Sequence, residues 1–248
     1  LSEPQKEILR WHQRLGHVCL RAIQFMMRSG ILGASKTTQQ LHSRAANLSA
    51  ESLPKCAACQ FGKQTNRAVP GKKTSIIRDR AGILSADKLH PGEKVFIDHF
   101  LCSTRGRTVK GHGIRDTAAN ETSNGYCGGC IFVDASTGFT HVEFQTHLTA
   151  FDTITAVKKF VDVAKDNGII VQAYASDNGS AFTSNEFRKY LADNNQTISF
   201  SGAGSHHQNG KAERGIRTVM AMARTMLLHD GIHWPAVADP TLWPLAVT

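Results

Sequence analysis

The sequence predicts an α/β fold in which helices flank a mixed five-stranded sheet, preceded by a small helical domain that binds a metal ion. Three observations predict it. After residue 93, five apolar runs of strand length are interspersed with helical patterns, as in layered α/β domains. Before residue 60, a histidine pair and a cysteine pair occur in a region too short for a large core. Between these regions, residues 71–92 are basic and rich in turn formers, which is typical of a linker.

The composition excludes two classes of protein. The chain has 248 residues, of which 41% are apolar and 20% charged, too apolar for a disordered chain. No apolar run approaches the ~20 residues of a membrane helix, and the start lacks a signal peptide. We therefore expect an intracellular protein without a membrane partner. Because the sequence does not begin with Met and ends within a helical pattern, we expect a piece of a longer chain, truncated at its C-terminal helix.

The positive charge is concentrated in the first third of the chain. Residues 1–80 hold 14 basic and 4 acidic residues, whereas residues 81–248 hold 15 and 16, for a total net charge of +9. A concentrated basic excess indicates a polyanionic partner such as nucleic acid, although a solvated surface is the simpler alternative. The basic linker could follow a phosphate backbone.

The histidine and cysteine pairs predict a structural zinc site within a domain of residues 1–70. His12 and His17 are followed, after 38 residues, by Cys56 and Cys59. Zinc prefers four nitrogen or sulfur ligands in a tetrahedron, and Cys-x-x-Cys supplies two of them. Cys19 could replace one histidine. A closed site contributes folding free energy to a domain with a small core. The apolar residues expected in that core are Ile8, Leu15, Leu20, Ile23, Met26, Met27 and Ile31.

A second cysteine pair, Cys127 and Cys130, runs directly into an apolar strand. No other histidine or cysteine pair stands at a suitable spacing for a metal site. We therefore expect these two cysteines to be structural.

The third region, residues 93–248, is predicted as one α/β domain. Its predicted strands are 94–101, 130–135, 139–144, 169–175 and 197–200. Its predicted helices are 149–167, 185–194 and 209–228. The polar, glycine-rich stretch 103–129 is expected to be a long loop. We expect Ser184 to cap the second helix and Gly168 to end the first, whose buried face would include Phe151.

Three carboxylates in this domain are candidates for one catalytic site. Asp98 interrupts an apolar strand, Asp177 ends another, and Glu213 lies in the first turn of the long helix. A buried carboxylate costs several kcal/mol unless it is paired or bound to a metal. Carboxylate oxygens suit Mg²⁺ or Mn²⁺, and two such ions assist phosphodiester displacement. Alternatively, Asp177 is only a turn residue and Glu213 only a helix stabiliser, and Asp134 rivals Asp98 as a strand acid.

These motifs resemble those of retroviral and retrotransposon integrases. The catalytic triad of integrases is resembled by Asp98, Asp177 and Glu213, with 35 residues between Asp177 and Glu213. The segments Asp177-Asn178-Gly179 and Gln208-Asn209-Gly210-Lys211-Ala212-Glu213-Arg214 agree with that family. The upstream His-His-Cys-Cys set resembles the zinc domain that precedes the integrase core in copia-type LTR-retrotransposon polyproteins. The resemblance covers about residue 8 to residue 248.

The resemblance implies a ribonuclease-H-like catalytic core at residues 93–248 and a divalent-metal transferase and endonuclease. The enzyme would process the 3′ ends of element DNA and join them to target DNA. It implies Mg²⁺ or Mn²⁺ at the triad, zinc in the first domain, a homo-oligomer, and association with other parts of a polyprotein. The enzyme would first be contained in cytoplasmic virus-like particles and would then act in the nucleus. The residues expected to contact DNA or steady the adjoining loop are Lys63, Lys72, Lys73, Asn178, Gln208, Asn209, Lys211, Arg214 and Arg217.

Two other functions are compatible with such a fold. A domesticated, catalytically silent DNA-binding or interaction module would not need all three carboxylates. A nuclease acting on RNA in hybrids would not need the zinc domain or the Asn-Gly-Lys-Ala-Glu helix. The presence of all three carboxylates, of the zinc motif and of this helix motif therefore favours the integrase hypothesis.

Overall fold

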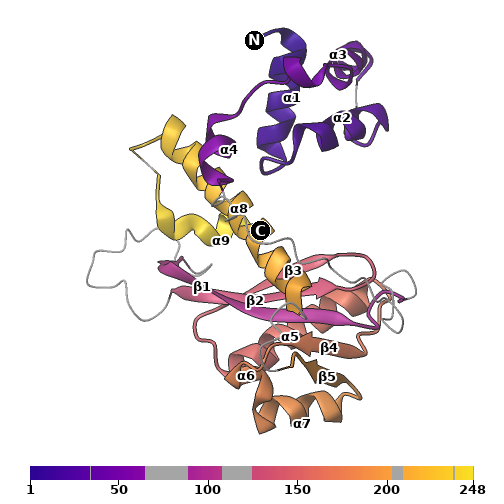
Figure 1. Cartoon of the computed structure of the whole chain (residues 1–248), viewed down its shortest axis with the longest axis vertical. Helices are drawn as coiled ribbons and strands as arrows, with labels where there is room; N and C mark the ends of the chain where they lie inside the picture. Colours follow the sequence, from indigo (N-terminus) through magenta and orange to yellow (C-terminus); the bar gives the residue numbers. More distant parts are fainter. Residues whose placement is uncertain (34, 65–88, 108–124, 203–208, 237, 248) are drawn as a thin grey trace, which may run out of the picture. The chain divides into compact units, whose positions relative to one another are not determined.

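The computed structural model describes residues 1–33, 35–64, 89–107, 125–202, 209–236 and 238–247, which fall into two compact units (Figure 1). Unit 1 comprises Leu1–Arg67 and Met220–Val247. Unit 2 comprises Ala68–Val219 and the terminal residue. In the described part of the chain, no helix is long and apolar enough to cross a membrane.

Unit 1 is helical. Its elements are α1 (Glu3–Arg14), α2 (Leu20–Arg28), α3 (Lys36–Ala46), η1 (Ala50–Ser52), α4 (Ala57–Gly62), the second half of α8 (Gly210–His233), η4 (Pro240–Leu242) and α9 (Trp243–Val247). Ile8 and Ile23 are fully buried at its centre, as the helical periodicity predicts. The expectation for Ile31 is wrong, because its side chain is 68% exposed. Helix α2 ends at Arg28, and the positive φ of Gly30 turns the chain away before Ile31.

Helix α4 packs closely against the second half of α8. A Cβ atom at Gly62 would lie 2.8 Å from the Cα of Thr225, a residue with no exposed surface. Glycine is therefore required at this position by the backbone of the neighbouring helix rather than by a turn. The contact explains why Met220–Val247 belongs to unit 1, whereas the sequence assigns these residues to the catalytic domain.

Replacing Gly62 by Ala should destabilise unit 1 by about 1–3 kcal/mol, because α4 and α8 must move apart. Thermal or denaturant unfolding would measure the change. Gly231→Ala is the matched control in the same unit, since its added Cβ would meet nothing closer than 4.0 Å. That control should be neutral or slightly stabilising, because alanine favours the helix. Equal stability of Gly62→Ala and the wild type would contradict the close packing.

Unit 2 is built around a five-stranded sheet with the strand order β3-β2-β1-β4-β5. The strands are β1 (Val95–Gly106), β2 (Tyr126–Asp134), β3 (Thr140–Gln145), β4 (Ala173–Ser176) and β5 (Thr197–Phe200). The first three pair antiparallel, whereas β1, β4 and β5 are parallel. This arrangement confirms the predicted mixed five-stranded sheet of a ribonuclease-H-like core.

The predicted loop 103–129 is wrong at both of its ends. Strand β1 continues to Gly106, and β2 begins at Tyr126, while residues 108–124 lie outside the described part. Gly128 and Gly129 lie within β2, where a Cβ at Gly128 would lie 2.9 Å from the carbonyl carbon of Phe100. These two glycines allow the close approach of the paired strands β1 and β2.

Helices cover both faces of the sheet. On one face, α5 (Ala150–Asp166) and α7 (Asn185–Asp193) pack against apolar residues of β1, β2 and β4. On the other face, the beginning of α8 packs through Ala212 against Ile131 and Val133. Figure 1 shows α5, α6 (Ser180–Thr183) and α7 near the strands that they cover.

The predicted caps are found where the sequence places them. Ser184 accepts a hydrogen bond from the amide of Phe187 at the start of α7, and Gly168 follows α5 with a φ of 72°. Phe151 was expected on the buried face of α5, but its side chain is 77% exposed. The predicted strand 169–175 is shorter in the structure, since β4 begins only at Ala173. The limits predicted for the three domains, 1–70, 71–92 and 93–248, stay predictions, because most of the linker lies outside the described residues.

Candidate functional sites

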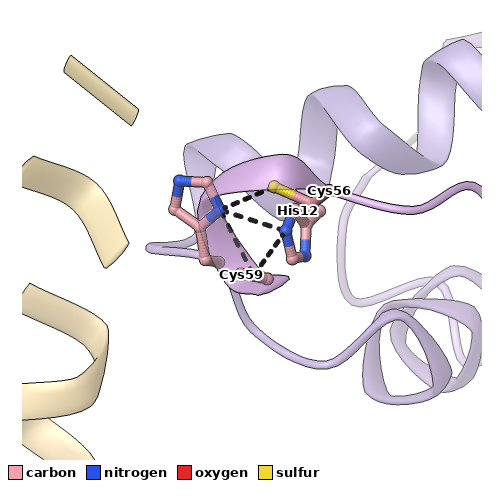
Figure 2. Close-up of side chains that lie close together, drawn as sticks. His12, Cys56 and Cys59 are labelled. Atoms are coloured by element: carbon pink, nitrogen blue, oxygen red, sulfur yellow. Dashed lines mark hydrogen bonds between the residues drawn. The ribbon is translucent and has the colours of Figure 1, made fainter. Parts of the chain in front are cut away.

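The four predicted zinc ligands come together in unit 1. The ligand atoms of His12, His17, Cys56 and Cys59 all lie within 4.8 Å of one another. Among the residues that the structure describes, this is the one group of three or more His, Cys, Asp or Glu with that closeness. Figure 2 shows His12 at the end of α1 facing the two cysteines at the start of α4. Cys19 is exposed and does not belong to the group.

The distances in this cluster fit a tetrahedral zinc site. Zn–N bonds of ~2.0–2.1 Å and Zn–S bonds of ~2.3 Å imply N···N separations of ~3.3 Å and N···S separations of ~3.6 Å. His12 Nε2 and His17 Nδ1 are 3.0 Å apart. The nitrogen-to-sulfur distances are 3.3 Å from His12 Nε2 to Cys59 Sγ, and 3.5 and 3.6 Å from His17 Nδ1 to Cys56 and Cys59 Sγ. A zinc ion would need only a small expansion of the cluster.

The backbone between the two histidines directs both rings to the same point. Helix α1 ends at Arg14, and the next turn places Gly16 and His17 in the left-handed region, with φ values of 66° and 61°. A non-glycine residue pays a conformational cost there, which is typical of functional positions. His12 Nδ1 donates to the carbonyl of Val18 at 2.7 Å, so its Nε2 carries the lone pair that a metal requires.

The protonation of the cluster suits a metal site. Burial, together with neighbouring His12, His229 and Lys63, lowers the pKa of His17 to about 4, so the imidazole is neutral at pH 7. Burial and the neighbouring Cys56 raise the pKa of Cys59 to about 11. A cation bound beside these half-buried cysteines and the neutral His17 ring would favour the ionised form of Cys59.

The second cysteine pair is structural, as expected. Cys130 is fully buried in the core of unit 2, and burial raises the pKa of its thiol. Cys127 Sγ donates to the carbonyl of Gln145 at 3.5 Å.

Two of the three candidate carboxylates in unit 2 lie just beyond the paired part of β1 and β4. β1 and β4 are parallel, with Val95 opposite Tyr174 and Phe96 opposite Ala175. Continuing that register by two residues places Asp177 beside Asp98. Side chains alternate along a strand, so Asp98 shares its face with Phe96, which packs against the cluster containing Ala212 of α8. Glu213 follows Ala212 directly.

The electrostatics agree with this placement. Burial raises the pKa of Asp98 to about 6, and the negative charges of Asp177 and, to a smaller extent, Glu213 act in the same direction. The amide of His99 donates to Asp98 Oδ1 at 2.8 Å and partly offsets the rise. The three carboxylates do not form as tight a group as the zinc ligands. Burial and the charges of Asp177 and Glu213 disfavour the ionised form of Asp98, which a cation bound beside it would favour.

Asp134, the rival strand acid, has a structural environment. One of its carboxylate oxygens accepts from the amide of Gly92. The other accepts from the amide of Ser136 and from the amide and hydroxyl of Thr137. Because these donors satisfy both oxygens, Asp134 stabilises the β2–β3 turn and is a poor candidate for a metal ligand.

Four residues expected to contact DNA or the adjoining loop make contacts within the protein. Lys63 donates from its ammonium group to the carbonyl of His17, beside the zinc cluster. Lys211 donates to the carbonyl of Ala135 at 2.6 Å. Asn178 donates to the carbonyl of Ser201 at 3.0 Å, which steadies the start of the loop.

Asn209 is the clearest correction. Its side chain is only 2% exposed and donates to the carbonyl of Ile97 at 3.1 Å, so it anchors α8 to β1 and is not available to DNA. Arg214 and Arg217 are exposed on α8, as a phosphate contact requires. The predicted contacts Lys72, Lys73 and Gln208 lie outside the described residues.

Sequence reasoning missed His99, which directly follows Asp98. Its Nε2 lies 3.0 Å from the hydroxyl of Thr153, and its ring stacks on Phe182 with centroids 4.4 Å apart. Burial lowers its pKa to about 4, so the ring is neutral. A polar residue within an apolar strand, next to a candidate ligand, was the signal that could have identified it.

The comparisons with known proteins match a family domain in the first part of the chain and two Pol polyproteins. Residues 1–64 match the GAG-pre-integrase domain family. The chain is 24% identical over 218 residues to a retrovirus-related Pol polyprotein from transposon TNT 1-94 of Nicotiana tabacum, covering 88% of this chain and 13% of that protein. It is 30% identical over 112 residues to the Pro-Pol polyprotein of feline foamy virus, covering 45% of this chain and 9% of that protein. The chain therefore spans only a small part of these relatives.

Solved structures similar to this chain include an integrase core domain and an intasome. The catalytic core domain of HTLV-2 integrase in complex with magnesium is 18% identical, with a TM-score of 0.42, covering 64% of this chain and 84% of that one. A chain of a simian T-cell lymphotropic virus intasome in complex with the PP2A regulatory subunit B56 gamma is 14% identical, with a TM-score of 0.46. The match covers 89% of this chain and 66% of that one. The sequence matches therefore identify a GAG-pre-integrase domain at residues 1–64, in a chain that is similar to parts of two Pol polyproteins.

Proposed function

We propose that this chain is the part of a retrotransposon integrase that processes the 3′ ends of element DNA and joins them to target DNA. The proposed reaction is a divalent-metal-dependent phosphodiester transfer at Asp98, Asp177 and Glu213. The observation that carries the proposal is that Asp98 and Asp177 each follow, by two residues, the last pair of the parallel β1–β4 ladder. The packing of Ala212 over the same face of the sheet supports Glu213 as the third member.

The residues of the site fit Mg²⁺ or Mn²⁺, since their only donor atoms are carboxylate oxygens. With two such cations bound, the site would gain the positive charge that polarises a phosphodiester and activates an attacking oxygen. Asp98 and Asp177 would hold one cation between them, and Glu213 would complete the second position. The hydrogen bond from the amide of Gly179 to Asp177 Oδ1, at 3.0 Å, keeps that carboxylate fixed at the end of β4.

The partners proposed are the element ends and the target DNA, bound through the basic first third of the chain and the exposed arginines of α8. The integrase would act as a homo-oligomer and begin as part of a polyprotein. We propose the nucleus as the place of action, after assembly of cytoplasmic particles. The zinc cluster of unit 1 would be a structural site, because four protein ligands leave no open position.

A strand-transfer assay tests this function. A labelled duplex with the terminal sequence of the parent element would be incubated with the chain and a supercoiled plasmid. With Mg²⁺ or Mn²⁺, we expect labelled DNA joined covalently to the plasmid, and with EDTA we expect none. A branched duplex that mimics the joined product offers a second substrate, because the reverse reaction uses the same site. Binding of both DNAs without any reaction would refute the catalytic proposal and favour the silent DNA-binding module.

A further inference from the structure

We propose that His99 is a positioning residue that sets the separation between Asp98 and Asp177 and thereby the affinity of the site for divalent cations. The inference rests on the proposed function, because it concerns the same carboxylates. His99 contacts the structure around both of them: its backbone lies beside Asp98, and its ring lies against the segment that follows Asp177.

The backbone ladder alone does not fix the two carboxylates relative to each other. The pairs between β1 and β4 are Val95–Tyr174 and Phe96–Ala175, so the ladder ends two residues before Asp98 and Asp177. A further connection between the two segments is therefore needed at the level of the carboxylates. His99 lies at that level, one residue beyond Asp98.

On the side of Asp98, the connection is a backbone hydrogen bond. The His99 amide donates to Asp98 Oδ1 at 2.8 Å, which selects one orientation of that carboxylate. Because side chains alternate along β1, the His99 ring points to the opposite face of the sheet, toward α5.

On the side of Asp177, the connection is a ring stack. The rings of His99 and Phe182 lie 4.4 Å apart with an angle of 16° between their planes. Phe182 is buried in the short helix α6, and its amide donates to the carbonyl of Gly179 at 3.1 Å. Gly179 in turn donates to Asp177 Oδ1, so the stack reaches the carboxylate through a single turn of chain.

Helix α5 holds the His99 ring in place. The hydroxyl of Thr153, a residue with no exposed surface, donates to the carbonyl of Thr149 at 2.7 Å. Its oxygen therefore accepts from His99 Nε2, at 3.0 Å. The hydrogen bond fixes the tilt of the imidazole, as outer partners do for groups near metal sites.

Two substitutions separate these contributions. His99→Phe keeps a flat ring against Phe182 and loses the hydrogen bond to Thr153, whereas His99→Leu loses both. His141→Phe is the matched control, because His141 is another half-buried histidine of the same sheet, packed near Phe132 and Phe160 but away from α6. Thermal unfolding would establish that each variant is folded. Should His99→Leu fail to fold, His99→Phe carries the test.

Binding of Mn²⁺, measured by calorimetry or electron paramagnetic resonance, is the first readout. Relative to the wild type, we expect His99→Leu to bind about 10–100-fold more weakly and His99→Phe to fall between them. His141→Phe should bind like the wild type. The second readout is strand transfer, in which excess Mn²⁺ should restore the rate of the His99 variants. A purely structural defect would not respond to metal in this way.

The outcomes distinguish this inference from the proposed function. If the wild type binds Mn²⁺ and joins DNA, and folded His99 variants do so at the same Mn²⁺ concentration, His99 has no positioning role and the proposed function stands. If His141→Phe weakens binding as much as His99→Leu, the effect is general destabilisation and the inference also fails. If the wild type neither binds Mn²⁺ nor joins DNA, both the proposed function and the inference are overturned.

Discussion

Replacing Asp177 by Asn should lower strand transfer by about 10²–10³-fold while leaving unit 2 folded, comparable to the loss of one preorganised electrostatic group in an enzyme site. The substitution keeps the shape of the side chain. Its remaining oxygen can still accept from the amide of Gly179, so the turn after β4 is retained. The charge that would hold a cation next to Asp98 is lost, and a neutral amide is a weaker ligand for Mg²⁺. A labelled strand-transfer assay measures the change.

Two control substitutions make this result specific. Glu186→Gln also removes one acidic charge, at an exposed position of α7, and should leave activity unchanged. Asp134→Asn should instead lower stability, because the new amide nitrogen cannot accept the hydrogen bonds that Ser136 and Thr137 donate. Full activity of Asp177→Asn would remove Asp177 from the catalytic set. Loss of activity in Glu186→Gln would show that net charge, rather than this position, matters.

Several helices and strands of unit 2 could be predicted from the sequence because the residues that begin or end them are local signals. Helix α7 has a serine at its start, α5 has a glycine after its end, and β5 is flanked by polar residues, so each is found at or within a residue of its predicted limits. The candidate carboxylates could be suggested for a similar reason, since acids within or at the ends of apolar runs are conspicuous. The relation between Asp98 and Asp177 could not, because it depends on the register of β1 and β4, which pairs residues far apart in the sequence.

Glycine explains the largest error. A run of polar residues and glycines suggests a loop, yet Gly128 and Gly129 lie within β2. Glycine stands at these two positions because a side chain there would collide with Phe100. Such a requirement depends on the partner strand and is invisible in the local pattern. The packing of Gly62 on Thr225 is a similar case, and it places the second half of α8 in the unit that the sequence assigns only to residues 1–70.

Buried polar partners explain the remaining differences. Basic residues near a candidate site suggest contacts with phosphate. The ammonium groups of Lys63 and Lys211, however, donate hydrogen bonds to backbone carbonyls of their own chain. Asn209 similarly satisfies the backbone of β1. A carbonyl that needs a donor cannot be recognised from sequence, because it depends on which strand or turn lies nearby.

Replacing Cys56 by Ser should remove one zinc ion per chain and unfold the first helices of unit 1. Structural zinc contributes about 10–16 kcal/mol of binding free energy in small zinc domains, more than a core of this size can replace. The site joins α1, the turn at His17 and α4, so its loss disconnects segments that are distant in the sequence. Elemental analysis would measure the zinc, and circular dichroism would measure the loss of helix.

The outcome for unit 2 separates a local effect from general misfolding. Its sheet core contains none of the four ligands, so unit 2 should keep its own unfolding transition in the Cys56→Ser variant. Cys19→Ser is the matched control, because Cys19 is an exposed cysteine of the same unit outside the cluster. It should keep both zinc and helix, whereas a strong chelator should reproduce the Cys56→Ser result in the wild type. Unchanged zinc content in Cys56→Ser, or zinc loss in Cys19→Ser, would show that the four clustered residues are not the ligands, because removing one of four protein ligands leaves a tetrahedral site incomplete.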